Sequence, residues 1–184
     1  MSHSETQGRL LLELARAAIA EALALPHTRP ERPAWLDTPG AVFVTLTQAG
    51  QLRGCIGSLV AWRPLGEDLT ANARAAALRD PRFPPLSPQE LPDTRVEVSL
   101  LSAPEPIACA SQADALAQLR PGLDGVILEW RGRRGTFLPQ VWEQLPRAED
   151  FLAHLKQKAG LPADYWADDV KLSRYTVEKF KEPA

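Results

Sequence analysis

The chain has 184 residues, of which 45% are hydrophobic and 24% are charged, and its formal net charge at pH 7 is -2. A chain of this length can bury a core without disulfide or metal support, so we expect one domain, or one domain with a subdomain. The charge balance gives no reason to expect binding to nucleic acid or to an anionic membrane.

The first predicted element is a helix, because apolar residues recur at helical spacing until Pro26. Ser4 and Gln7 can form a capping box at the start of this helix. Prolines then punctuate residues 26–39, which we expect to form a well-defined connecting loop.

Helical and β-rich patterns alternate along the rest of the chain, and turn residues separate them. Hairpins interrupted by helices indicate an α+β fold with mainly antiparallel pairing rather than a doubly wound parallel sheet. The expected elements are strands over 41–47 and 52–59, a helix over 65–79, a short helix or turn at 87–90, a strand over 95–101, a helix over 111–119, strands over 125–130 and 136–138, a helix over 149–158 and a strand over 171–180.

The segment from Arg53 to Gly57 places a cysteine between two glycines, directly after an arginine. Gly54 and Gly57 allow another group to approach the backbone closely, and a nearby guanidinium would stabilise a Cys55 thiolate. The segment therefore predicts one of two structures. It forms an electropositive pocket with a reactive or ligand-binding thiol, or it forms a bent strand in which Cys55 is a small apolar filler.

A second candidate cluster consists of Asn72, Asp80 and Arg82, with Phe83 beside them. Prolines stiffen residues 80–86, and such a loop can present polar groups to a ligand at a fixed geometry. The alternative is structural, because Asp80 and Arg82 can brace the preceding helix while Phe83 fills the core.

Two further polar features have both a functional and a structural interpretation. Glu97 begins an apolar strand and could meet Arg53 or Arg82 across the sheet, either as a structural ion pair or as a catalytic carboxylate. The arginine-rich turn 131–134 could contact a phosphate group, although such turns are usually solvated.

The run Arg53 to Gly57 resembles the hallmark of the AMMECR family, whose bacterial members are called AmmeMemoRadiSam system protein A. The resemblance implies a single AMMECR-like domain over residues 1–184, with helices on a larger sheet, a smaller subdomain within about 80–140, and a cleft between them near the cysteine. Further similar blocks follow in order at residues 40–46, 72–73, 80–86, 97–102, 119–122, 124–125 and 136–142.

The resemblance also implies that the protein functions as a component of the AmmeMemoRadiSam system, together with a Memo-like protein and a radical S-adenosylmethionine enzyme. In this interpretation the cleft binds a small molecule or a partner peptide, with Cys55 and Arg53 as the catalytic candidates. The candidate ligand-binding residues are Gly54, Gly57, Asn72, Asp80, Arg82 and Glu97.

Two other functions stay open from the sequence. One is a stand-alone enzyme that uses Cys55 as nucleophile, with Arg53 and Asn72 as anion donors. The other is a binding module of the transcription, translation or repair machinery, which the net charge disfavours if it requires nucleic acid. Whether the protein is an enzyme at all is left open.

Several classes of chemistry and location are not expected. Cys55 and Cys109 lie far apart without Cys-x-x-Cys spacing, so neither a zinc site nor a disulfide framework is predicted. Of the three histidines only His154 could approach Cys55, and a lone helical histidine more often lies at the surface. No cofactor motif occurs, so we expect no cofactor. We expect a cytoplasmic protein without membrane contact, because the sequence shows no signal-peptide pattern and no apolar run of membrane-spanning length.

Overall fold

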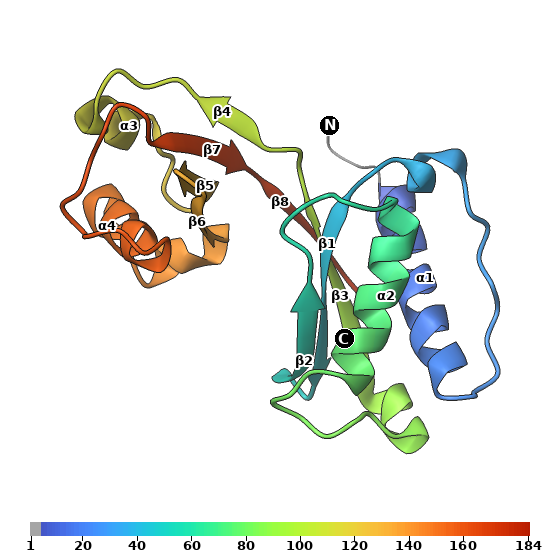
Figure 1. Ribbon diagram of the computed structural model, residues 1–184. Coiled ribbons are helices and arrows are strands. Elements are labelled where there is room, and N and C mark those ends of the chain that lie inside the picture. The colour runs from blue at the N-terminus through green and yellow to red at the C-terminus, as the bar shows by residue number, and fades with distance from the viewer. Residues whose placement is uncertain (1–4) are drawn as a thin grey trace. The chain divides into compact units, whose positions relative to one another are not determined.

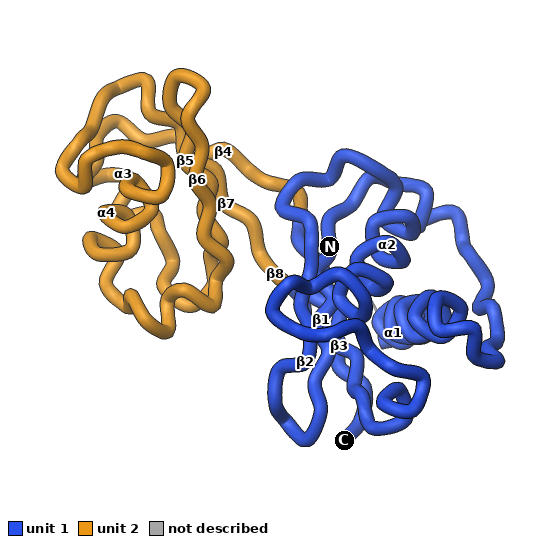
Figure 2. Tube along the Cα trace, turned by 60° about the horizontal axis from the view of Figure 1, so that its bottom comes forward, with its two compact units in different colours: residues 1–102, 178–184 blue, residues 103–177 orange. Residues whose placement is uncertain are grey.

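A computed structural model describes residues 5–184 (Figure 1). The predicted capping residue Ser4 lies outside the described residues. The chain forms two compact units, one made of residues up to Ser102 together with Glu178–Ala184, and the other of Ala103–Val177 (Figure 2). The subdomain expected within about 80–140 overlaps the second of these units in part.

The larger unit is a four-stranded sheet in the order β2-β1-β3-β8, with α1 and α2 packed on one face (Figure 1). The central strand β1 pairs in antiparallel register with both β2 and β3. The elements of this unit are α1 (Glu5–Ala22), the 3-10 helix η1 (Ala34–Asp37), β1 (Ala41–Gln48), β2 (Gln51–Gly57), α2 (Leu65–Leu78), the 3-10 helix η2 (Pro88–Asp93), β3 (Thr94–Leu101) and β8 (Val177–Lys181).

Alternation along β1 explains how this sheet packs. Val42, Val44 and Leu46 are fully buried and belong to a core that also contains residues of α1 and α2. Successive side chains of a strand point to opposite faces, so Thr45 lies on the face that the two helices do not cover. The sheet therefore has one buried apolar face and one more polar face.

The smaller unit is a second sheet, in the order β4-β7-β5-β6, with its own helices and core. Trp142 and Phe151 stack in this core with ring centroids 3.8 Å apart. The elements are β4 (Glu105–Ile107), α3 (Gln112–Gln118), β5 (Gly125–Trp130), β6 (Arg133–Phe137), the 3-10 helix η3 (Pro139–Glu143), α4 (Ala148–Lys158) and β7 (Lys171–Tyr175). The predicted α+β class, with antiparallel sheets flanked by helices, is confirmed.

The structure differs from the predicted elements in two places. The single strand expected over 171–180 is two strands, because β7 pairs with β5 whereas β8 is a neighbour of β3 in the other sheet. The connection between the strands expected over 125–130 and 136–138 is shorter than predicted and contains only Arg131 and Gly132, which have φ values of 45° and 78°. These left-handed conformations suit a two-residue hairpin turn, so the next residues already belong to β6.

Candidate functional site

Cys55 lies near the end of the edge strand β2, opposite Thr45 of β1. The neighbours of Thr45 in β1 point into the core, so Thr45 and Cys55 share the face of the sheet that α1 and α2 leave open. The Thr45 hydroxyl lies 3.3 Å from the Cys55 sulfur, within hydrogen-bond distance. The thiol is partly exposed on this face.

Glu97 extends the same row of side chains across the sheet. Thr45 pairs with Cys55 on one side and with Glu97 of β3 on the other. The Glu97 carboxylate forms ion pairs of 3.4 Å with Lys181 and 3.9 Å with Lys179. Its partners are therefore lysines of β8 rather than the arginines considered from the sequence, because β1 separates Glu97 from β2.

Asp80 and Arg82 bind the backbone of Cys55 from the outer edge of the sheet. The Cys55 N–H donates to Asp80 Oδ2 at 2.9 Å, and the Cys55 carbonyl accepts from Arg82 Nη2 at 3.3 Å. Asp80 also accepts from Arg82 Nε at 3.0 Å and from Arg82 Nη2 at 2.7 Å. The ion pair thus takes the place of a neighbouring strand at this position of β2.

The charges of this pair are strongly coupled. The side chain of Asp80 is 2% exposed, whereas that of Arg82 is 55% exposed. The hydrogen bonds from Arg82 hold the pKa of Asp80 well below its usual value, and the Cys55 N–H adds to this effect. The same bonds raise the pKa of Arg82, with a smaller contribution from charge on Cys55. Arg82 is therefore a permanent cation close to the thiol.

Arg53 is directed away from this row of side chains by an irregularity in β2. Leu46 pairs with Gly54, but Thr47 pairs with Leu52, so Arg53 has no partner in β1. An extra residue of this kind is a β-bulge, which turns the side chain out of the regular alternation. In a regular strand, residues two positions apart lie on the same face. The bulge breaks this rule for Arg53 and Cys55.

The Arg53 guanidinium pairs with Glu90 of η2. Arg53 Nε and Nη2 donate to the two carboxylate oxygens of Glu90 at 3.1 and 3.2 Å. The backbone N–H of Ser87 and then Arg53 lower the pKa of Glu90 to about 2. Arg53 and Arg82 also lie over the ring of Phe83, with guanidinium carbons 6.0 and 5.5 Å from its centroid. Phe83 and these two ion pairs therefore connect the two clusters predicted from the sequence.

Gly54 and Gly57 are required by close packing rather than by unusual backbone angles, because neither has a positive φ. A Cβ atom on Gly54 would overlap the carbonyl oxygen of Ala76 in α2. A Cβ atom on Gly57 would overlap the ring of Phe43 in β1. These two glycines therefore let β2 lie against the helix on one face and against an aromatic ring on the other.

Asn72 belongs to a different polar network, beside the end of β2. Its side-chain amide donates to the Val42 carbonyl, the Ser58 hydroxyl and the Asp68 carboxylate, each at 3.1 Å. Asp68 is fully buried and also accepts from Arg63 Nε at 2.8 Å. These bonds attach the middle of α2 to β1, so Asn72 takes part in packing the helix on the sheet.

Two residues of the site were missed from the sequence, and each had a detectable signal. Glu90 stands three residues after Ser87, and this spacing is typical of a capping box, which the structure contains. The Glu90 carboxylate that caps η2 also accepts the hydrogen bonds from Arg53. The alternation of β1 predicts that Thr45 lies on the polar face, but the bulge at Arg53 is what brings Cys55 opposite it.

The arrangement offers a thiol, a half-exposed guanidinium and an aromatic ring for binding. The hydroxyl of Thr45 is a poor general base, and His154 lies exposed on α4 in the other unit. Among residues 5–184 no group of three His, Cys, Asp or Glu side chains is arranged to hold a metal ion. No helix within that range is both long enough and apolar enough to cross a membrane.

These observations define a two-unit α+β protein with a cysteine motif on the edge strand of its larger sheet. Residues 12–180 match the AMMECR1 family, and the chain belongs to that family.

Relatives cover almost the whole chain. A protein of Methanothermobacter thermautotrophicus is 42% identical over 191 residues, which cover 97% of this chain and 96% of the relative. A protein of Methanocaldococcus jannaschii is 43% identical over 185 residues, covering 96% of this chain and 90% of the relative. The crystal structure of the uncharacterised protein PH0010 from Pyrococcus horikoshii is similar with a TM-score of 0.79 at 37% identity, covering 97% of this chain and 93% of that one.

Proposed function

We propose that this protein is component A of the AmmeMemoRadiSam system and that the surface around Cys55 binds a small molecule or a peptide segment of a partner. The partners in this proposal are a Memo-like protein and a radical S-adenosylmethionine enzyme, acting with it in the cytoplasm. Membership of the AMMECR1 family supports the assignment to the system.

The main support for a binding role is that Asp80 and Arg82 both form hydrogen bonds with the backbone of Cys55. An edge strand normally offers its free N–H and C=O groups to an added strand. Both groups of Cys55 are already bound, so a ligand is recognised at this residue through side chains instead. Arg82 Nη1 takes no part in these bonds and can donate to a carboxylate of the ligand.

A binding role agrees better with the charges than a nucleophilic one. Arg53 is paired with Glu90 and Arg82 with Asp80, so both guanidinium charges near the motif are balanced by carboxylates. The hydrogen-bond partner of the thiol is a hydroxyl group, which does not accept a proton readily near neutral pH. A stand-alone enzyme using Cys55 would need a base from its substrate or from a partner.

Binding to the two partner proteins from the same genome tests the proposal. Wild-type protein is titrated with each purified partner by calorimetry, and small molecules that co-purify with it are identified by mass spectrometry. We expect Cys55→Ser to weaken binding about ten-fold. Cys109→Ser is the matched control, because Cys109 lies in the other unit, and we expect it to bind like wild type. If neither partner binds and no small molecule co-purifies, the proposal is wrong.

A further inference from the structure

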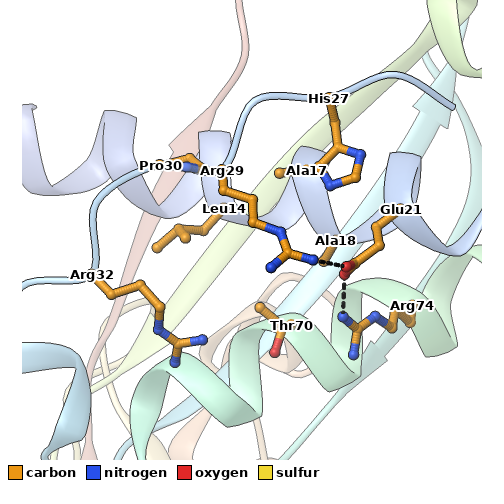
Figure 3. A pocket seen from close by; sticks show the side chains of 10 residues that line it. All are labelled: Leu14, Ala17, Ala18, Glu21, His27, Arg29, Pro30, Arg32, Thr70 and Arg74. Atoms are coloured by element: carbon orange, nitrogen blue, oxygen red, sulfur yellow. Dashed lines mark hydrogen bonds and ion pairs between the residues drawn. The ribbon is translucent and has the colours of Figure 1, made fainter.

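A cavity of about 310 Å³ lies between α1, α2 and the loop that follows α1 (Figure 3). It is lined by residues of the larger unit alone and shares none with the surface around Cys55. Leu14 and Ala17 of α1 form part of an apolar wall, whereas arginines line the loop and α2. Its volume is at the lower end of the range for small-molecule sites, which is about 300 to 1,000 Å³.

Positive charge exceeds negative charge in this cavity. Arg29, Arg32 and Arg74 line it, and Glu21 is the one acidic residue among the described residues that line it. Arg29 donates to one oxygen of Glu21 at 2.6 Å, and Arg74 donates to the other at 2.8 Å. Three guanidinium groups and one carboxylate leave a formal charge of +2, counted as 3 minus 1.

Of the three arginines that line the cavity, Arg32 alone has no anionic partner among the described residues. It forms no ion pair or hydrogen bond with any residue in the described part of the chain. Its guanidinium lies over Gly66 in the first turn of α2, where a Cβ atom would overlap Arg32 Nη2. The start of a helix carries partial positive charge, which favours an anion bound there beside the Arg32 guanidinium. Glu67 and Asp68, the acidic residues of the same turn, do not line the cavity.

The donors of these arginines face a common space. In the view of Figure 3, Thr70 lies between Arg32 and Arg74, and Arg29 lies above them beside Glu21. Arg29 and Arg74 each use Nη2 on Glu21, so their Nε and Nη1 groups remain available. Guanidinium groups bind carboxylates and phosphates through paired N–H groups, which makes this set suitable for an anionic ligand.

We propose that this cavity binds a small organic dianion, either a phosphate monoester or a dicarboxylate. Its anionic groups bind Arg32 and the free donors of Arg29 and Arg74, and its carbon body lies against Leu14 and its neighbours in α1. Two negative charges match the formal charge of the cavity. This second site is independent of the function proposed for Cys55.

Substitutions of Glu21 and Arg32 should change the affinity for the dianion in opposite directions. Its carboxylate competes with the ligand for Arg29 and Arg74, so Glu21→Gln should bind the dianion more tightly. Arg32→Gln removes a cation that no carboxylate of the described residues uses, so it should bind the dianion more weakly without loss of an ion pair or a hydrogen bond. Arg79→Gln, at the end of α2 and outside the cavity, is the matched control for loss of one positive charge.

The experiment is a calorimetric titration of the full-length protein with phenyl phosphate and with succinate, at constant ionic strength. We expect at least one of the two probes to bind, with affinity about ten-fold lower in Arg32→Gln, about three-fold higher in Glu21→Gln, and unchanged in Arg79→Gln. Preference for phenyl phosphate identifies a phosphate monoester, and preference for succinate identifies a dicarboxylate. The proposal is overturned if neither probe binds wild type or Glu21→Gln below about 10 mM, or if Arg79→Gln weakens binding as much as Arg32→Gln.

Discussion

Asp80 closes the free edge of β2 at Cys55, through a bond of 2.9 Å from the Cys55 N–H to its carboxylate. The residue that completes this closure, Arg82, stands two positions further along the chain and contacts the Cys55 carbonyl. The middle of the family's hallmark segment is thereby held by a loop that follows α2.

Asp80→Ala should lower the free energy of unfolding by about 3 kcal/mol, because it leaves the Cys55 N–H without its partner and removes the counter-ion of Arg82. Arg82→Gln should lower the free energy of unfolding by less, since Asp80 still accepts hydrogen bonds from the backbone N–H groups of Cys55 and of residue 82. Urea unfolding of the two variants measures the difference. Equal losses would show that the ion pair, rather than closure of the strand edge, provides the stability.

Glu90 should make stability depend on acidic pH. Its pKa is about 2 in the folded protein against an ordinary value of 4.5, chiefly because the Ser87 N–H and Arg53 bind the carboxylate. A carboxyl group with a lowered folded pKa stabilises the fold above its unfolded pKa and loses that contribution as pH falls toward the folded value. Wild type should therefore exceed Glu90→Gln in stability at pH 7, and the two should converge toward pH 2.

Urea unfolding at pH 7, 5 and 3 measures this convergence. Glu31→Gln, which changes an exposed carboxylate in the loop after α1, serves as the control for general loss of negative charge. A constant difference between wild type and Glu90→Gln at all three pH values would contradict the role of this ionised pair.

Substitution of the two motif glycines should have unequal effects. Gly54→Ala would press a methyl group against the Ala76 carbonyl oxygen, which the helix holds in place, and should cost about 3 kcal/mol. Gly57→Ala would meet the ring of Phe43, a partly exposed side chain that can rotate, and should cost about 1 kcal/mol. Cys55→Ser, which keeps a small side chain, should also cost about 1 kcal/mol.

Thermal melts of these three variants provide the comparison. If Cys55→Ser melted far below Gly54→Ala, then Cys55 would be a core residue, and the whole segment would have a structural role.

Alkylation of the native protein should label Cys55 before Cys109. Both thiols are partly exposed. Burial, and to a smaller extent the charge of Asp114, raises the pKa of Cys109, so it holds less of the reactive thiolate at a given pH. Brief treatment with iodoacetamide, followed by peptide mass spectrometry, gives the order of modification. The opposite order would remove Cys55 from any accessible site.

Local patterns in the sequence were enough to predict the elements around the site. Two β-rich runs joined by a short turn predict the β1–β2 hairpin from neighbouring residues alone, whereas the bulge at Arg53, which shifts the register at Cys55, was not predicted. The alanine-rich composition of α2 and the Asp80-Pro81 stop likewise predict its extent. Several blocks in register, centred on Arg53 to Gly57, identified the family.

Only the tertiary structure decided which partner each charged side chain takes. Arg53 is close to Cys55 in the sequence, yet a bulge turns it toward Glu90, 37 residues away. Arg82, 27 residues from Cys55, is the arginine that contacts it. Strand and helix periodicity depends on neighbouring residues, whereas an ion pair between distant residues depends on packing of the whole chain. For the same reason the continuous β pattern of residues 171–180 did not show that its two halves enter different sheets.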